Sequence, residues 1–145
     1  MAKEAVINDL KQVLADTYAL YLKTQNYHWN VTGPNFIALH DMFESQYDDL
    51  AETIDTVAER IRALGPKAPG GFKVYSQLAK VADGDENADA ATMVRHLADD
   101  HTQLAKTCQG ALENAAAVGD EATFDLFVGR ISEHEKTAWM LNSSL

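Results

Sequence analysis

The stretch YHWNVTGPNFIALHDMFESQYDDLAETIDTVAER, which runs from Tyr27 to Arg60, decides how this chain folds. Apolar residues recur in it every three or four positions, which is the period of a helix with one buried face. The sequence TGP at residues 32–34 breaks this pattern, and proline suits the first turn of a new helix. Two helices joined by a short turn are therefore predicted, and two histidines and seven carboxylates lie among their apolar residues.

The remaining residues extend this pattern into four long helices. The first is predicted over about residues 3–31 and the second over about 34–65. Between the second and the third lie a loop over 65–71, a short helix within 72–81 and a polar turn over 83–87. Gly119 and Asp120 suit a helix end and a helix cap, so they separate the third long helix from the fourth. The long link predicts an all-α four-helix bundle with a short extra helix in the crossover, in one domain covering residues 1–145.

Composition and charge exclude several classes of protein. The formal net charge is -10, so the surface repels nucleic acid and anionic membranes and attracts cations. No apolar run approaches the roughly 18–20 residues that span a membrane, and the first residues lack the apolar stretch of a signal peptide. The single cysteine, Cys108, cannot form an intrachain disulfide, which is typical of a reducing compartment. We therefore expect a cytoplasmic protein with no membrane partner.

The predicted second helix carries candidate metal ligands in two pairs, His40 with Glu44 and Asp55 with Glu59. With His40 at zero on a helical wheel, the other three lie at about 40°, 60° and 100°, so all four share one face. His40 and Glu59 are nonetheless roughly 28 Å apart along the helix axis, whereas metal–ligand bonds are about 2.0–2.2 Å long. No single ion can bind both pairs, so each pair is half of a site.

The two pairs are symmetric, because the midpoint of positions 40 and 59 is also the midpoint of positions 44 and 55. A second copy of the helix, laid antiparallel across this midpoint, brings the His–Glu pair of one chain to the Asp–Glu pair of the other. A two-fold axis makes this happen twice. His28, at the end of the first helix, is a candidate for a further nitrogen ligand. The sequence thus predicts halves of two metal sites that are shared between subunits.

Simpler interpretations compete with the metal site. Carboxylates on a helix are most often a solvated face, and four acids of this helix need no other role: Asp41, Asp48, Asp49 and Glu52. A lone histidine is more often structural or exposed than a ligand, which applies to His96, His101 and His134. A mixture of carboxylate and imidazole suits iron or manganese redox chemistry better than structural zinc, although zinc and manganese can compete with iron for it.

These residues also carry a family resemblance. The stretch over residues 27–65 and the C-terminal GDEATFDLFVGRISEHEKTAWML resemble the Dps family, the mini-ferritins named as DNA-binding proteins from starved cells. In that family an H-W-N histidine is followed twelve residues later by a second histidine and then by an acid four positions further on. A D-x-x-x-E pair from the neighbouring subunit completes the ferroxidase site. The resemblance covers essentially the whole chain and implies a ferritin-like four-helix bundle.

By this resemblance the ferroxidase site consists of five residues, which match the family's motif in chemical type: His28, His40, Glu44, Asp55 and Glu59. Ferritins outside the family build the site inside one bundle with E-x-x-H, which this chain lacks. The resemblance further implies a hollow dodecamer with tetrahedral symmetry. Such a shell binds Fe(II) at a di-iron site, oxidises it with hydrogen peroxide in preference to oxygen, and stores the ferric mineral inside as a defence against oxidative stress.

Two further roles follow from the resemblance. Acids at the start of the last helix are candidates for negative pores on three-fold axes that guide Fe(II) inward: Asp120, Glu121 and Asp125. Acids also favour a helix N-terminus through its dipole, which explains the first two without a pore. Trp29, beside His28, is a candidate electron donor to the iron site, with a packed core aromatic as the alternative.

Competing functions are a nucleic-acid protein, as the family name suggests, and a purely structural helical assembly. Family members that bind DNA directly often use a lysine-rich terminal tail. Here Lys3 is the only base before the helical pattern, and the last residues, MLNSSL, contain none. The sequence therefore argues against direct DNA binding, although an association with the nucleoid through divalent ions remains open. The symmetry of the ligand pairs argues against a purely structural role.

Overall fold

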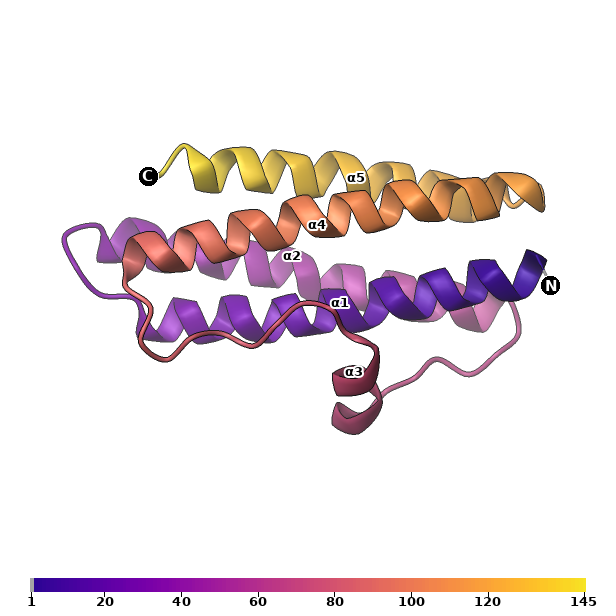
Figure 1. The fold of residues 1–145 in the computed structure, drawn as a ribbon, viewed down its shortest axis with the longest axis horizontal. Coiled ribbons are helices and arrows are strands. Elements are labelled where there is room, and N and C mark those ends of the chain that lie inside the picture. The colour runs from indigo at the N-terminus through magenta and orange to yellow at the C-terminus, as the bar shows by residue number, and fades with distance from the viewer. Residues whose placement is uncertain (1) are drawn as a thin grey trace.

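The computed structural model describes residues 2–145, and every regular element within them is a helix (Figure 1). The helices are α1 (Ala2–Asn30), α2 (Phe36–Ala63), α3 (Phe72–Leu78), α4 (Ala90–Ala117) and α5 (Glu121–Asn142). The prediction of four long helices with a short helix in the link is confirmed. None of the helices in the described residues offers an apolar segment long enough to cross a bilayer.

The bundle consists of two helical hairpins. α1 packs along α2 and α4 packs along α5, while α1 also contacts α4 and joins the hairpins. As Figure 1 shows, α2 and α4 run in the same direction, so the chain between them returns along the length of the bundle. Antiparallel neighbours need only short turns, whereas a parallel pair needs this crossover. The crossover lays α3 against α1.

The hairpin of α4 and α5 turns where the sequence predicted it. Gly119 has a φ of +72°, in the left-handed region that glycine adopts without a steric cost and that commonly ends helices. The side chain of Asp120 then accepts a hydrogen bond from the Thr123 backbone N–H at 3.0 Å, which caps α5. The predicted helix end and helix cap are both confirmed.

Buried Asp16 of α1 fastens the crossover to the bundle. Its carboxylate accepts hydrogen bonds from the backbone N–H groups of Lys80 and Val81 at 2.6 and 3.0 Å, and from the Gln12 amide at 2.9 Å. These bonds satisfy a buried charge and two backbone donors together. They fix the chain directly after α3, so the position of α3 on α1 is set by specific contacts.

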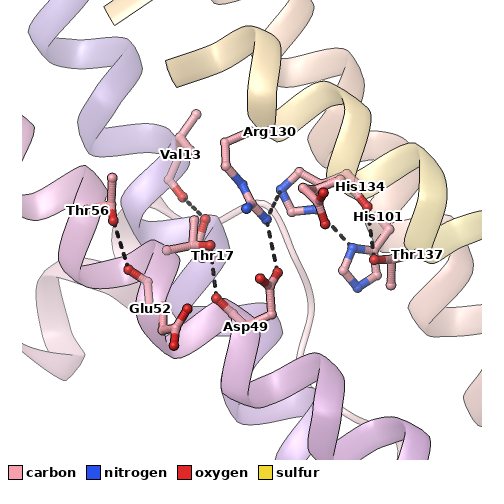
Figure 2. Close-up of polar contacts among 11 residues, drawn as sticks. Val13, Thr17, Asp49, Glu52, Thr56, His101, Arg130, His134 and Thr137 are labelled. Atoms are coloured by element: carbon pink, nitrogen blue, oxygen red, sulfur yellow. Dashed lines mark hydrogen bonds and ion pairs between the residues drawn. The ribbon is translucent and has the colours of Figure 1, made fainter. Parts of the chain in front are cut away.

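A second polar group lies inside the bundle, around Arg130 of α5 (Figure 2). The Arg130 guanidinium lies 3.6 Å from the Asp49 carboxylate and 3.4 Å from His134 Nε2. Arginine only donates, so His134 Nε2 accepts, and His134 therefore donates from Nδ1 to Nδ1 of His101 at 2.9 Å. Burial, with the Arg130 charge, lowers the pKa of His101 to about 3. Both histidines are thus neutral and structural. Asp49, which the sequence placed on a solvated face, forms an ion pair with Arg130.

Candidate metal centre

The turn between α1 and α2 brings His28 and His40 into stacked contact, with ring centroids 3.8 Å apart and ring planes at 15°. His28 Nδ1 is 2.7 Å from the carbonyl oxygen of His40, and His40 Nδ1 is 2.7 Å from the carbonyl oxygen of His28. A carbonyl only accepts, so Nδ1 of each ring carries a proton and donates. With Nδ1 as the donor, the neutral form of each ring has its lone pair on Nε2, which is the form in which histidine binds a metal.

The local sequence explains why this reciprocal pair forms. α1 ends at Asn30, and Gly33 has a φ of +116° that turns the chain back at once. The Phe36 N–H donates to the Gly33 carbonyl at 3.1 Å, and the Phe36 ring stacks on His40 with centroids 5.0 Å apart. His28 is 5% exposed, so its orientation is fixed by packing as well as by hydrogen bonds.

Glu44 lies one helical turn after His40, and its Oε1 is 4.0 Å from His28 Nε2. Its side chain is 54% exposed, so the carboxylate is accessible to an ion from outside the chain. The structure therefore brings three of the five predicted ligands to one end of the α1–α2 hairpin. Imidazole nitrogen with carboxylate oxygen is a donor set that suits iron, so the residues present fit the predicted metal.

Tyr47 is part of this centre and was missed by the sequence analysis. Its ring meets the His28 ring edge to face, with centroids 5.2 Å apart and planes at 74°. Burial raises the pKa of Tyr47, and the carboxylates of Glu44 and Asp48 raise it further, so the residue is a neutral phenol. The available signal was its spacing, because residue i+3 from Glu44 lies next to it on a helix.

Asp55 and Glu59 lie farther along the same continuous helix, and both are exposed. The rise of an α-helix separates Glu59 from His40 by roughly 28 Å. Within residues 2–145 no three His, Cys, Asp or Glu side chains lie close enough together to hold one metal ion. A single chain therefore presents an incomplete ligand set at each end of α2, and the sharing of these sets between subunits stays a prediction.

The other predicted site residues fall into two groups. Trp29 is 64% exposed in the single chain, so it is not part of the core of its own bundle, and its role as an electron donor stays a prediction. Glu121 and Asp125 are exposed on α5. Asp120 is engaged instead: besides capping α5, it accepts a hydrogen bond from the Arg60 guanidinium at 2.8 Å. Its contacts are those of a structural residue, and the pore role of all three acids stays a prediction.

Comparisons of the sequence and of the structure with known proteins point to the same family. Residues 7–145 match the ferritin-like domain family. A DNA protection during starvation protein of Porphyromonas gingivalis is 38% identical over 95% of this chain and 87% of its own length. Dps from Staphylococcus aureus is 34% identical, with a TM-score of 0.94 over 97% of this chain and 94% of its own. Dps of Vibrio cholerae, described as a member of a superfamily of ferritin-like diiron-carboxylate proteins, is also 34% identical, with a TM-score of 0.93 over 98% and 89% of the two chains.

Proposed function

Because this chain belongs to the Dps family of ferritin-like proteins, we propose that it is a ferroxidase and iron store that protects its cell against oxidative stress. The observation that carries the proposal is the reciprocal hydrogen bonding of His28 and His40, which uses Nδ1 of both rings and leaves Nε2 for a metal, with His28 Nε2 4.0 Å from the Glu44 carboxylate. A purely structural histidine pair needs neither a free Nε2 nor an accessible carboxylate next to it.

The substrate is Fe(II), and hydrogen peroxide is the proposed oxidant in preference to oxygen. Two Fe(II) ions give one electron each, the O–O bond of peroxide breaks, and two protons complete two water molecules. Oxidation of the irons as a pair avoids the release of a hydroxyl radical, which a single Fe(II) would produce. The protein supplies three donors from one chain, His28, His40 and Glu44, and the net charge of -10 attracts the cation.

The remaining ligands come from a second subunit. Asp55 and Glu59 lie on the same α2 helix at the symmetric positions, so an antiparallel partner helix supplies them to the histidine end of the first chain. The proposed assembly is a dodecameric shell with mineral inside. Glu121 and Asp125 are the better candidates for an acidic uptake pore, because Asp120 is already paired with Arg60. Trp29 is an exposed candidate donor of an electron beside the site.

The test is complementation in mixed oligomers. His40→Ala chains and Glu59→Ala chains are each expected to form shells that oxidise Fe(II) slowly, as measured by stopped-flow absorbance with peroxide. Co-assembly places one intact site and one doubly altered site in each heterodimer. With random pairing, half of the dimers are mixed, so about a quarter of the wild-type rate should return.

Two results would contradict the proposal. Wild-type rates in either single variant would remove that residue from the site. A mixed shell that stays inactive, with light scattering showing intact oligomers, would mean that sites are not shared between chains. A matched control is Glu52→Ala, which removes an exposed carboxylate of α2 outside the proposed ligand set and should keep the wild-type rate.

Direct DNA binding is not part of the proposed function, although relatives carry the name DNA protection during starvation protein. A net charge of -10 opposes binding to phosphate. Protection by removal of Fe(II) and peroxide needs no contact with DNA, because these two reagents together generate the damaging radical.

A further inference from the structure

Four of the chain's five tyrosines form one continuous series of ring contacts that begins at the candidate metal centre. Tyr47 meets His28 with centroids 5.2 Å apart, and Tyr21 meets Tyr47 at 5.8 Å. Tyr21 then meets Tyr18 at 5.8 Å, and Tyr18 stacks on Tyr75 at 4.9 Å with planes at 26°. A series of phenols thus leads from a proposed iron ligand to the crossover.

Three helices build this tyrosine series. Tyr18 and Tyr21 are three residues apart on α1, Tyr47 comes from α2, and Tyr75 comes from α3. The Tyr75 hydroxyl donates to the Pro69 carbonyl at 2.6 Å, which fixes the last ring. The anchoring of the crossover on Asp16 therefore holds the final member of the series in place.

Ordinary aromatic packing accounts for each pair but not for the whole arrangement. Aromatic pairs prefer edge-to-face or offset stacking at these distances, and each stabilises a bundle modestly. The four rings of the series are all half-buried, however, whereas the fifth tyrosine, Tyr27, is fully buried. Tyr27 lies outside the series, and its hydroxyl bonds to His96 at 2.9 Å. Phenols in mutual contact can pass an electron from ring to ring.

We propose that the tyrosine series supplies the second electron when peroxide meets a site that holds a single Fe(II), and that it carries the resulting oxidising equivalent to Tyr75. This inference rests on the proposed ferroxidase function. One electron comes from Fe(II) and one from Tyr47, so that H2O2, Fe(II), the Tyr47 phenol and one proton give two water molecules, Fe(III) and a Tyr47 phenoxyl radical.

The radical then moves outward by exchange between neighbours. In each step an electron moves to the oxidised ring, which takes up a proton from water. The phenol that lost the electron releases its proton to water, so one phenol is restored and the next becomes a radical. Tyr18 and Tyr75 line a cleft of about 340 Å³ together with Phe72, which is 80% exposed. A small one-electron reductant, such as ascorbate, can therefore reach the last ring and restore it.

The experiment uses the assembled protein loaded with less than one Fe(II) per site and then mixed with peroxide. Freeze-quench electron paramagnetic resonance detects the tyrosyl radical, and peptide mass spectrometry locates oxidised tyrosines. In the wild-type protein we expect a tyrosyl signal and oxidation at Tyr18 and Tyr75, which ascorbate should suppress. Tyr21→Phe should keep oxidation at Tyr47 while reducing it at Tyr18 and Tyr75 several-fold. Tyr47→Phe should reduce oxidation at Tyr21, Tyr18 and Tyr75.

Tyr27→Phe is the matched control, since it removes a phenol outside the series and should leave the radical yield unchanged. Equal oxidation of Tyr75 in Tyr21→Phe and wild-type protein would overturn the proposal, because it would mean direct attack from solution. A radical confined to Trp29 would overturn it as well. Fe(II) oxidation serves as a separate readout: its absence would refute the ferroxidase function, whereas fast oxidation without a tyrosyl signal would refute only the tyrosine series.

Discussion

Replacing Asp120 will separate its structural role from a role in an iron pore. One carboxylate oxygen accepts from the Thr123 N–H at 3.0 Å and from Arg60 at 2.8 Å, and the other accepts from the Thr123 hydroxyl at 2.6 Å. Arg60 also donates to that hydroxyl at 2.9 Å. Asp120→Ala removes the helix cap and leaves Arg60 without its carboxylate, whereas Asp120→Asn keeps an oxygen that can cap the helix.

The contacts set the expected magnitude. Loss of a helix cap costs about 0.5–2 kcal/mol, and loss of a hydrogen bond between charged groups costs about 1.5–3 kcal/mol when the groups are buried. The Arg60 side chain is 26% exposed, so water recovers part of the second cost. We expect Asp120→Ala to lower the free energy of unfolding by about 2–4 kcal/mol, and Asp120→Asn by about 1–2 kcal/mol. The Ala variant should then melt about 4–16 °C lower.

The dependence on pH gives the sign of the charge contribution. Burial alone would raise the pKa of Asp120, but the hydrogen bonds from Thr123 and the charge of Arg60 outweigh it and hold the pKa below its usual range. A carboxylate with a lowered pKa in the folded state stabilises the protein above its unfolded pKa, and this contribution is lost as the pH falls through the folded pKa. The stability difference between wild type and Asp120→Ala should therefore shrink below about pH 4.

Thermal unfolding is followed by circular dichroism at one protein concentration, because the stability of an oligomer depends on concentration. Equal melting temperatures for wild type and Asp120→Ala would refute the structural reasoning. Iron uptake at low salt is measured on the same proteins. If Asp120→Asn slows uptake as much as Asp125→Asn, Asp120 belongs to the pore after all. We expect the rate to fall in Asp125→Asn and to hold in Asp120→Asn.

Three further outcomes are expected. Arg130→Ala removes the ion-pair partner of Asp49 and the donor to His134. It should lower the free energy of unfolding by about 1–3 kcal/mol in urea, with Fe(II) oxidation in the intact shell unchanged. Gly119→Ala should cost about 1–2 kcal/mol because its φ is +72°, whereas Gly110→Ala, in open space within α4, should be neutral or stabilise by up to about 1 kcal/mol. A gel-shift assay with duplex DNA, chelator and about 0.15 M salt at neutral pH should show no shift, and a salt-sensitive shift would reveal a basic surface.

The helices could be predicted from the sequence because the spacing of the apolar residues indicated each long helix, and the glycine, proline and aspartate residues between them indicated the turns. Two helix ends have causes that the pattern did not show. α2 begins at Phe36 because the four preceding residues form the turn around Gly33. α3 stops at Leu78 because the backbone N–H groups of Lys80 and Val81 bond to Asp16 on another helix. A contact between residues so far apart in the chain leaves no trace in a local pattern.

Some features of the candidate site could likewise be predicted from the sequence, and others could not. Helical geometry predicted that the His40–Glu44 pair is separate from the Asp55–Glu59 pair, because that separation depends only on the rise of one helix. The reciprocal bonds between His28 and His40 depend on the path of the backbone through a turn, which spacing does not specify. The contact of Tyr47 with His28 depends on how two helices pack.

In the proposed arrangement, a site divided between chains also controls where iron is oxidised. An unassembled subunit has three donors at one end of α2 and two at the other, so it lacks a complete di-iron site at either end. Fe(III) formed on free subunits would precipitate in the surrounding solution, whereas Fe(III) formed in a closed shell can be held inside. Oxidation that begins only once two α2 helices have met therefore couples catalysis to assembly, with no regulatory element beyond the symmetry of four residues on one helix.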